Sequence, residues 1–404
     1  MDTSEESHRS PSGREPDAAR HRRAWARWLA PLVLAVAIPA TAPWVGVLRE
    51  WVRHTFGLGY LRWVTGGLAV VGAAALVWAI VRIRERRLLR YGALALAGAL
   101  IALQVIGWRV GTAEADVVER VHLLEYGLLA ILFAAALRPR HGGRLLPVLA
   151  LLAVALVSLA DELVQWLTPV RVGDGRDVLL NLWAGAIGLL FGLALAPPAH
   201  LSGVSGSASR RLAAGLGAAA VLAGALFFDL AHLGHEIRDP GAGVFLSWHS
   251  ADGLERAAGD RARRWAAGGG PPGRPLALED RFWTEAGWHA NVRNHAVATG
   301  DLATAWRENR ILERWYAPFV ALPGQHWPPA QKEGIRAELR LRDPSALRPS
   351  PRYRSSALRE RVVGWPPRAL LWTVAVVVAG ALGLLAVASR GARKMGERLE
   401  DTVR

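Results

Sequence analysis

The stretch Leu145–Leu167 reads LLPVLALLAVALVSLADELVQWL, and this stretch decides the class of fold. No charged residue occurs between its start and Ala160. An α-helix rises about 1.5 Å per residue, so roughly 20 apolar residues cross a bilayer. The stretch is therefore long enough to span a membrane, and its charged pair, Asp161 and Glu162, comes only near its end.

Seven further apolar runs of similar length flank this stretch, and eight such runs are poorly explained as core helices of a soluble protein. The sequence predicts an all-α fold, namely a polytopic helical membrane bundle of about eight spans. The candidate spans are Trp28–Leu48, Trp63–Val81, Tyr91–Trp108, Val121–Leu137, Leu145–Leu167, Val178–Ala196, Leu212–Phe228 and Ala369–Ser389.

Composition agrees with a division into apolar and polar blocks. The chain has 404 residues, of which 52% are hydrophobic and 21% are charged, and its mean hydropathy is still positive at +0.19. It has no cysteine, which excludes disulfides, thiolate zinc sites and cysteine nucleophiles. The net charge of +15 fits arginine-rich loops beside anionic lipid. We therefore expect no nucleic acid partner, and we also expect no cofactor and no metal.

The distribution of arginine predicts the orientation. Both tails and the connections on the same side carry 21 Lys and Arg residues, whereas the connections on the other side carry 7. Cytoplasmic loops are enriched in these residues, so both termini should be cytoplasmic and the protein should be a multi-pass protein of the cytoplasmic membrane. The first run also resembles a secretory signal ending at Ala40-Thr41-Ala42, although Pro43 argues against cleavage.

The same reasoning divides the chain into segments, of which 229–368 should be external or periplasmic. Six tryptophans lie near span ends, where the headgroup zone favours their rings: Trp28, Trp63, Trp108, Trp166, Trp365 and Trp372. The expected order is a cytoplasmic basic tail at 1–27, three transmembrane helices within 28–108, a three-helix membrane core at 119–196, a seventh transmembrane helix at 212–228, an external domain at 229–368, a last transmembrane helix at 369–389 and a cytoplasmic tail at 390–404.

The external segment should form a small, mostly helical domain. Ser250–Ala267 has an amphipathic helical pattern, and Leu278–Thr299 and Asp301–Tyr316 are expected to form a helical pair. The short apolar stretch Gly243–Trp248 indicates a contact with the membrane surface. Ile335–Arg342 alternates apolar and charged residues, which fits a half-exposed strand or a helix.

Three neighbouring spans carry polar residues at ends that face the same side. His122, Glu125 and Tyr126 share one helix face by their i, i+3, i+4 spacing, as do Glu162 and Gln165. Such groups inside a membrane are costly unless paired or hydrated, so they indicate a functional site; the alternative is an ion-pair network that locks three helices. The ligand-binding candidates are Arg120, His122, Glu125, Tyr126, Glu162, Gln165, Arg171, Arg176, Asp177 and Asn181, with Glu125, Glu162 and His122 as candidates for acid–base catalysis.

These residues also form a recognisable series of motifs. A basic residue and a histidine precede a tyrosine, and Glu-x-x-Gln, Pro-x-Arg and Asp-x-x-x-Asn-x-x-x-Gly follow in that order. Over Glu119–Gly192 the sequence resembles the VanZ-like membrane domain. It departs from that pattern at Arg120, where a lysine is common, and at Gly175, near where a small hydroxyl residue is common. The matching positions are Arg120, His122, Tyr126, Glu162, Gln165, Pro169, Arg171, Asp177, Asn181 and Gly185.

The resemblance implies a polytopic protein of the bacterial cell envelope, whose namesake is linked to low-level resistance to the glycopeptide teicoplanin. The residue types predict binding or processing of a lipid-linked or peptidoglycan-related ligand at the outer face, with Arg171 and Arg176 able to clamp an anionic group. Whether the protein is an enzyme stays open. The alternative is a non-enzymatic accessory or assembly subunit of a larger membrane protein complex.

Overall fold

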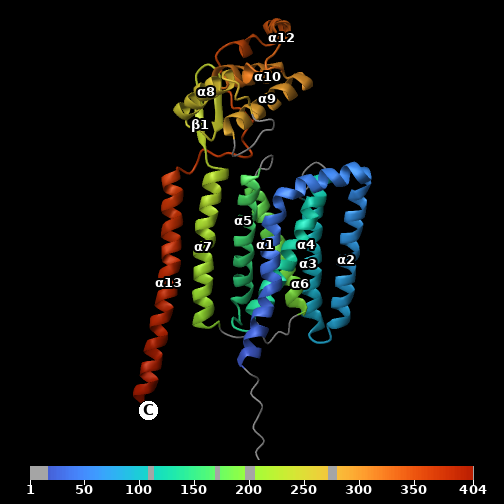
Figure 1. Cartoon of the computed structure of the whole chain (residues 1–404), viewed down its shortest axis with the longest axis vertical. Helices are drawn as coiled ribbons and strands as arrows, with labels where there is room; N and C mark the ends of the chain where they lie inside the picture. The colour runs from blue at the N-terminus through green and yellow to red at the C-terminus, as the bar shows by residue number, and fades with distance from the viewer. Residues whose placement is uncertain (1–16, 108–112, 169–172, 196–204, 272–279, 404) are drawn as a thin grey trace, which may run out of the picture.

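The computed structural model describes residues 17–107, 113–168, 173–195, 205–271 and 280–403. Long helices form a bundle, and a smaller region, residues 232–367, sits at one end of it (Figure 1). We call this smaller region the head. The bundle comprises α1 (Asp17–Phe56), η1 (Gly57–Gly59), α2 (Tyr60–Arg82), α3 (Arg87–Gly107), α4 (Ala113–Leu137), α5 (Leu146–Leu167), α6 (Gly175–Leu195), α7 (Ser207–Ala231) and α13 (Arg368–Val403).

Within the described residues, seven helical segments are long and apolar enough to cross a bilayer. The first, Trp25–Arg82, is 58 residues long, far more than one crossing needs. It contains the first two expected spans, joined through η1, and Figure 1 shows the chain turning back between α1 and α2. The polytopic helical bundle that the sequence predicts is therefore confirmed, with two of its expected spans forming one nearly continuous helical segment.

The centre of the bundle is formed by α1, α4, α5 and α6. Its buried side chains include Leu129, Phe133, Leu149 and Val154. At the periphery, α2 and α13 leave most of their apolar side chains exposed, as expected for helices that face lipid. The N-terminal end of α1 and the C-terminal end of α13 both lie at the end of the bundle away from the head (Figure 1).

A close approach between two backbones holds α4 against α6. A Cβ placed on Gly188 of α6 would collide with the backbone of Gly127 of α4, so only glycine allows the two helices to pack at this distance. Lipid tails are as apolar as leucine, so helices in a membrane associate through such close packing and through hydrogen bonds.

The head begins with a β-hairpin that the sequence analysis did not anticipate. Strands β1 (His235–Asp239) and β2 (Gly243–Ser247) pair antiparallel. Oδ1 of Asp239 accepts hydrogen bonds from the N–H groups of Gly241 and Ala242 at 2.7 and 2.8 Å, which is the usual way an aspartate stabilises a tight turn. The expectation of a membrane-surface contact over Gly243–Trp248 is wrong, because this stretch is a buried strand with Phe245 in the core of the head.

The remaining elements of the head are helical. They are α8 (Ala251–Ala266), α9 (Arg281–Thr299), α10 (Leu302–Trp315), α11 (Ala317–Val320), α12 (Pro329–Arg342) and η3 (Pro344–Leu347). Ser250 caps α8 and Asp301 caps α10, which confirms the helices expected there. The ambiguous stretch Ile335–Arg342 is the second half of α12, with Ile335 and Leu339 buried one turn apart.

Aromatic side chains join the head to the bundle. Trp166, at the end of α5, packs against Trp248 of the head with ring centroids 5.4 Å apart, and Arg281 of α9 lies over both rings. Trp166 has no exposed surface. Its expected position among lipid headgroups is therefore wrong, because the head covers this span end, whereas Trp63 and Trp365 are exposed as expected.

Candidate functional site

The polar side chains expected to converge lie on α4, α5 and α6, which contact one another pairwise. The start of α4, the end of α5 and the start of α6 meet at the end of the bundle nearest the head (Figure 1). His122 and Tyr126 come from α4, Glu162 and Gln165 from α5, and Asn181 from α6. The shared orientation of these span ends, which follows from the alternating direction of successive helices, brings the residues together.

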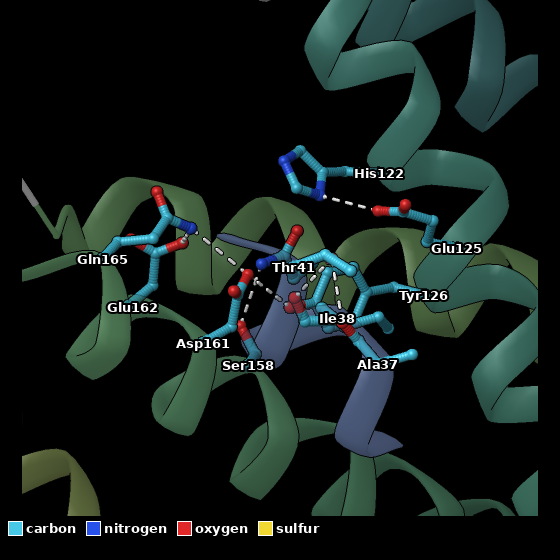
Figure 2. Close-up of polar contacts among 11 residues, drawn as sticks. Ala37, Ile38, Thr41, His122, Glu125, Tyr126, Ser158, Asp161, Glu162 and Gln165 are labelled. Atoms are coloured by element: carbon cyan, nitrogen blue, oxygen red, sulfur yellow. Dashed lines mark hydrogen bonds and ion pairs between the residues drawn. The ribbon is translucent and has the colours of Figure 1, made fainter. Parts of the chain in front are cut away.

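A buried chain of hydrogen bonds links α4 to α5 (Figure 2). The hydroxyl of Tyr126 donates to Oδ2 of Asp161 at 2.9 Å. The amide of Gln165 donates to the same oxygen at 3.2 Å and to Oε1 of Glu162 at 3.0 Å. All four side chains are at most 4% exposed, so their polar groups satisfy one another inside the bundle. We call this set the polar chain.

Glu162 extends the polar chain to the loop before α6. Its Oε2 accepts the backbone N–H of Asp174 at 3.0 Å. Gly173 passes so close to the carbonyl of Glu162 that a Cβ there would collide with it. Deeper in the bundle, the amide of Asn181 donates to the hydroxyl of Ser158 at 3.0 Å, so a second buried hydrogen bond joins α6 to α5.

His122 and Glu125 form a separate pair on α4, with His122 one turn before Tyr126 and Glu125 directly before it. Nδ1 of His122 lies 3.2 Å from Oε2 of Glu125, which is within ion-pair distance. The side chain of His122 is 27% exposed and that of Glu125 is 36% exposed. Figure 2 shows this pair apart from the polar chain, and its two side chains are more exposed than those of the polar chain.

A pocket of about 250 Å³ lies between α1, α2, α4 and α5. One part of its lining is polar and contains His122, Glu125, Asp161 and Gln165. The rest is mainly apolar and comes largely from α1, with Thr41 and Arg49 as its polar members. The remaining lining residues are Ile38, Ala42, Val45, Leu48, Val52, Tyr60, Val64, Val117 and Val121. The pocket therefore combines a long apolar wall with a compact polar end.

The basic residues of the expected site point elsewhere. Nη2 of Arg176 pairs with Oε1 of Glu119 at 2.8 Å, and its Nη1 lies 3.6 Å from Oδ1 of Asp177. Arg120 donates to the hydroxyl of Thr65 on α2 at 3.2 Å. None of these side chains lines the pocket. Arg171, with Pro169, lies outside the described residues.

The acidic and histidine side chains do not gather around a common centre suited to a metal ion. No group of three or more such residues with that geometry occurs in the described part of the chain. Glu119 faces Arg176, whereas His122 faces Glu125, so the Glu-x-x-His spacing does not direct both side chains to one point.

Sequence reasoning missed three contributions to the site. Asp161 is central to the polar chain, and its i, i+4 relation to Gln165 could have identified it. Ser158, which is not among the expected site residues, accepts a hydrogen bond from the amide of Asn181. The α1 wall carries no local signal, because its residues are apolar positions of a span and only tertiary packing places them at the pocket.

The head contains its own buried polar cluster. Glu285 of α9 accepts hydrogen bonds from the hydroxyls of Ser247 and Tyr316 and from the N–H of Trp248, each at 2.7 Å. Complete burial nevertheless raises the pKa of Glu285 to about 7, although these donors lower it. The cluster therefore contains a carboxyl group, that of Glu285, whose pKa lies near neutral pH.

Beside it, Ser355, His289 and Glu308 superficially resemble a catalytic triad. Glu308 lies 2.7 Å from Nδ1 of His289, and the hydroxyl of Ser355 lies 3.4 Å from the same nitrogen. A nucleophile and an orienting carboxylate must contact opposite ring nitrogens. His289 is also fully buried, so this group stabilises the head rather than catalysing a reaction.

A family comparison agrees with the geometry of the bundle. Residues 71–196 match the family model described as VanZ/LLP1. These residues form a VanZ/LLP1 domain. No curated protein and no solved structure matches the chain. The family domain begins earlier than the resemblance over Glu119–Gly192 suggests, because it takes in α3 and the second half of α2.

The extent of the VanZ/LLP1 domain divides the pocket in two. The polar end comes from α4 and α5, inside residues 71–196. Most of the apolar wall comes from α1 and from Tyr60 and Val64 of α2, outside the match, while Val117 and Val121 of α4 complete it from inside the match. The polar end is thus built by the family domain, and most of the wall is built by residues to which no family is assigned.

Proposed function

We propose that this membrane protein binds or processes a lipid-linked or peptidoglycan-related ligand in the pocket between α1 and the VanZ/LLP1 domain. The pocket itself is the observation that carries the proposal. Its apolar wall suits a hydrocarbon chain, and its polar end suits the group attached to that chain. Ligand sites of this kind combine a mainly apolar lining with a few placed polar groups.

The two carboxylates of the pocket, Glu125 and Asp161, have different roles in this proposal: the first contacts the ligand and the second supports the site. Glu125 is partly exposed and pairs only loosely with His122, so it is available to exchange a proton or a hydrogen bond with a bound molecule. Asp161 is held by Tyr126 and Gln165, which fixes its position at the bottom of the polar end. Glu125 and His122 are therefore the candidates for an acid–base role.

The cell envelope is the setting we propose for this activity. The arginine bias supports an orientation with both termini in the cytoplasm and with the head and the polar end of the pocket on the external side. A role in lowering susceptibility to glycopeptides follows from the VanZ resemblance alone. Expression of the chain should then raise the inhibitory concentration of teicoplanin, and Glu125→Gln should remove the increase.

Native mass spectrometry of the protein released gently from its own membrane tests the proposal. We expect a retained mass of lipid size in the wild type and its loss in Glu125→Gln. Glu50→Gln is the matched control, because Glu50 is an exposed carboxylate of α1 that pairs with Arg53 at 2.8 Å and does not line the pocket. Equal retention by both variants would contradict the assignment of the pocket.

The alternative is an accessory subunit, and the polar chain favours it. Tyr126, Asp161, Gln165 and Glu162 satisfy one another across two helices, which is what a structural lock requires. A stoichiometric protein partner without any bound small molecule would support this alternative. Removal of the head would then abolish the partner's mass, whereas a pocket ligand should persist in part.

A further inference from the structure

Helix α1 is longer than a single membrane crossing requires. It has 40 residues, and a rise of about 1.5 Å per residue gives it a length of about 60 Å, whereas the hydrocarbon core of a bilayer is about 30 Å thick. Its N-terminal end lies at the end of the bundle away from the head, and α2 returns from the opposite end (Figure 1). About half of α1 is therefore left over once the crossing is complete.

Two prolines inside α1 account for a bend at this point. Pro39 and Pro43 each lack the N–H that would bond to the carbonyl four residues earlier, and sharp helix kinks occur mainly at proline. Between them, the hydroxyl of Thr41 donates to the carbonyls of Ala37 at 2.8 Å and Ile38 at 3.1 Å, a contact that often bends helices as well. In Figure 1 the blue ribbon of α1 rises through the bundle and then runs across the end nearest the head.

The part of α1 after the bend, residues 44–56, has one face on the pocket. We call this part the roof segment. Residues three and four apart share a helix face, and the members of this face are Val45, Leu48, Arg49 and Val52. They line the pocket together with the first turns of α2 and α4, so the roof segment covers the pocket at the end of the bundle nearest the head.

A second face of the roof segment is apolar and exposed. Trp44, Val47 and Trp51 follow one another at the same helical spacing, and their exposed fractions are 70%, 66% and 59%. Exposure of so much apolar surface to water is unfavourable. Tryptophan in particular is enriched where a membrane meets water, so the composition of this stripe matches the headgroup zone.

A third face of the roof segment is charged. Nη2 of Arg53 lies 2.8 Å from Oε1 of Glu50, and the two side chains are 46% and 51% exposed. Both positions are turned away from the stripe of Trp44, Val47 and Trp51, given 3.6 residues per turn. A helix with tryptophan on one side and charge on the other lies in the plane of the membrane interface.

We propose that the roof segment is an interfacial helix, docked into the boundary between headgroups and acyl chains of the leaflet nearest the head. The lipid is the partner because the segment continues directly from one membrane crossing and leads into the next, α2, which keeps it level with the span ends. This inference goes beyond the proposed function and holds for any ligand. The bilayer surface then fixes the position of the helix that covers the pocket.

Spin-labelled single-cysteine variants of the full chain test the inference, because the protein has no cysteine of its own. The variants are Val47→Cys, Glu50→Cys, Trp51→Cys and Arg53→Cys, reconstituted in phosphatidylcholine vesicles. All four positions are exposed, so the label does not disturb a packed core. Electron paramagnetic resonance measures how often each label collides with oxygen, which concentrates in lipid, and with a nickel chelate, which stays in water.

Two further variants calibrate these collision rates. Val70→Cys reports lipid, because Val70 is a 69% exposed position of α2, and Glu333→Cys reports water, because Glu333 lies on the surface of the head. We expect the ratio of oxygen to nickel collisions to be at least threefold higher at Val47 and Trp51 than at Glu50 and Arg53. The ratio should therefore rise and fall with the turn of the helix.

The other possible patterns contradict an interfacial helix. A ratio that falls steadily from Val47 to Arg53 would mean that α1 leaves the membrane upright, because depth would then change by about 9 Å over six residues. Equal ratios at all four positions would exclude distinct lipid and water faces. Few collisions with either reagent at Val47 and Trp51 would mean that protein, such as a second copy of the chain, covers the stripe in place of lipid.

Discussion

Asp161 is the residue on which the polar chain depends. It is 2% exposed and accepts from a tyrosine on one helix and a glutamine on its own helix. A buried carboxylate is costly unless its oxygens are hydrogen-bonded, so each donor contributes to stability as well as to position. The hydrogen bonds that fix the position of Asp161 in the pocket therefore also hold α4 to α5.

Replacement of Tyr126 by phenylalanine removes one of these donors without changing the shape of the side chain. We expect Tyr126→Phe to lower the free energy of unfolding by about 1–3 kcal/mol, because a buried acceptor loses a partner. Thermal unfolding in detergent measures the effect. Tyr60→Phe, at a partly buried tyrosine of the pocket wall, is the control and should have little effect. Equal losses would show that the Tyr126 hydroxyl does not support Asp161.

In the head, the raised pKa of Glu285 predicts that the stability of the head depends on pH. Burial raises its pKa to about 7 in the folded protein, above the value of about 4.3 for an unperturbed glutamate. The folded head therefore binds more protons than the unfolded head between these values, and its stability should fall as pH rises through this window. Across this window the free energy of unfolding of the head should fall by an amount on the order of 3 kcal/mol.

Glu285→Gln is the test of this dependence. The variant cannot titrate, so the unfolding temperature of its head, followed by tryptophan fluorescence, should change less than that of the wild type from pH 4.5 to 7. Parallel profiles for the two proteins would mean that another group controls the pH response.

At the scale of elements, helix packing depends on a few small residues. Gly188→Ala should push α6 away from the backbone of Gly127 on α4 and destabilise the bundle by about 1–3 kcal/mol, the usual range for overpacking. Gly98 of α3 has open space around its Cβ position. Gly98→Ala should therefore be neutral or stabilise by about 0.5–1 kcal/mol, since glycine is unfavourable in a helix. Unfolding in detergent compares the two, and equal effects would exclude a specific contact.

The helices were predictable because their signals are local. A run of about 20 apolar residues specifies a span, and Asp301 and Gly300 mark the boundary between α9 and α10 by cap and left-handed turn. The hairpin was not predicted, because two strands of five residues carry little periodic signal and their pairing is a tertiary property.

The sequence predicted only part of the site, because it carries local signals but does not show which helices contact one another. Helix spacing placed His122, Glu125 and Tyr126 on one face and Glu162 beside Gln165. It could not show that Arg176 turns to Glu119, because that contact joins α6 to α4. Nor could it show that α1 closes the pocket, because the apolar residues of α1 look the same whether they face lipid or a cavity.

At the scale of the whole molecule, the head and the VanZ/LLP1 domain are joined by specific contacts. Nε2 of His232 accepts the N–H of Gly175, at the start of α6, at 2.9 Å, while Nδ1 contacts the carbonyl of Arg361 in the head at 2.8 Å. The imidazole therefore carries its proton on Nδ1, since a carbonyl can only accept. The loop that holds Glu162 through Asp174 thus also contacts the head, so the head can affect the geometry of the site.

The orientation of the whole molecule is testable because the chain has no cysteine. Glu333→Cys places a thiol on an exposed position of the head, and Arg84→Cys places one in the turn between α2 and α3, at the opposite end of the bundle (Figure 1). A maleimide that cannot cross membranes should label the first variant in intact cells and the second only after lysis. The reverse pattern would place the head in the cytoplasm.

Photocrosslinking within the native membrane tests most directly whether the pocket holds a ligand. A benzophenone amino acid at Val45 lies in the pocket wall, whereas the same group at Val47 lies on an exposed face of α1. We predict that Val45 yields one discrete adduct, which Glu125→Gln abolishes, and that Val47 yields a mixture of bulk lipids. The same mixture at both positions, unchanged by Glu125→Gln, would contradict the account.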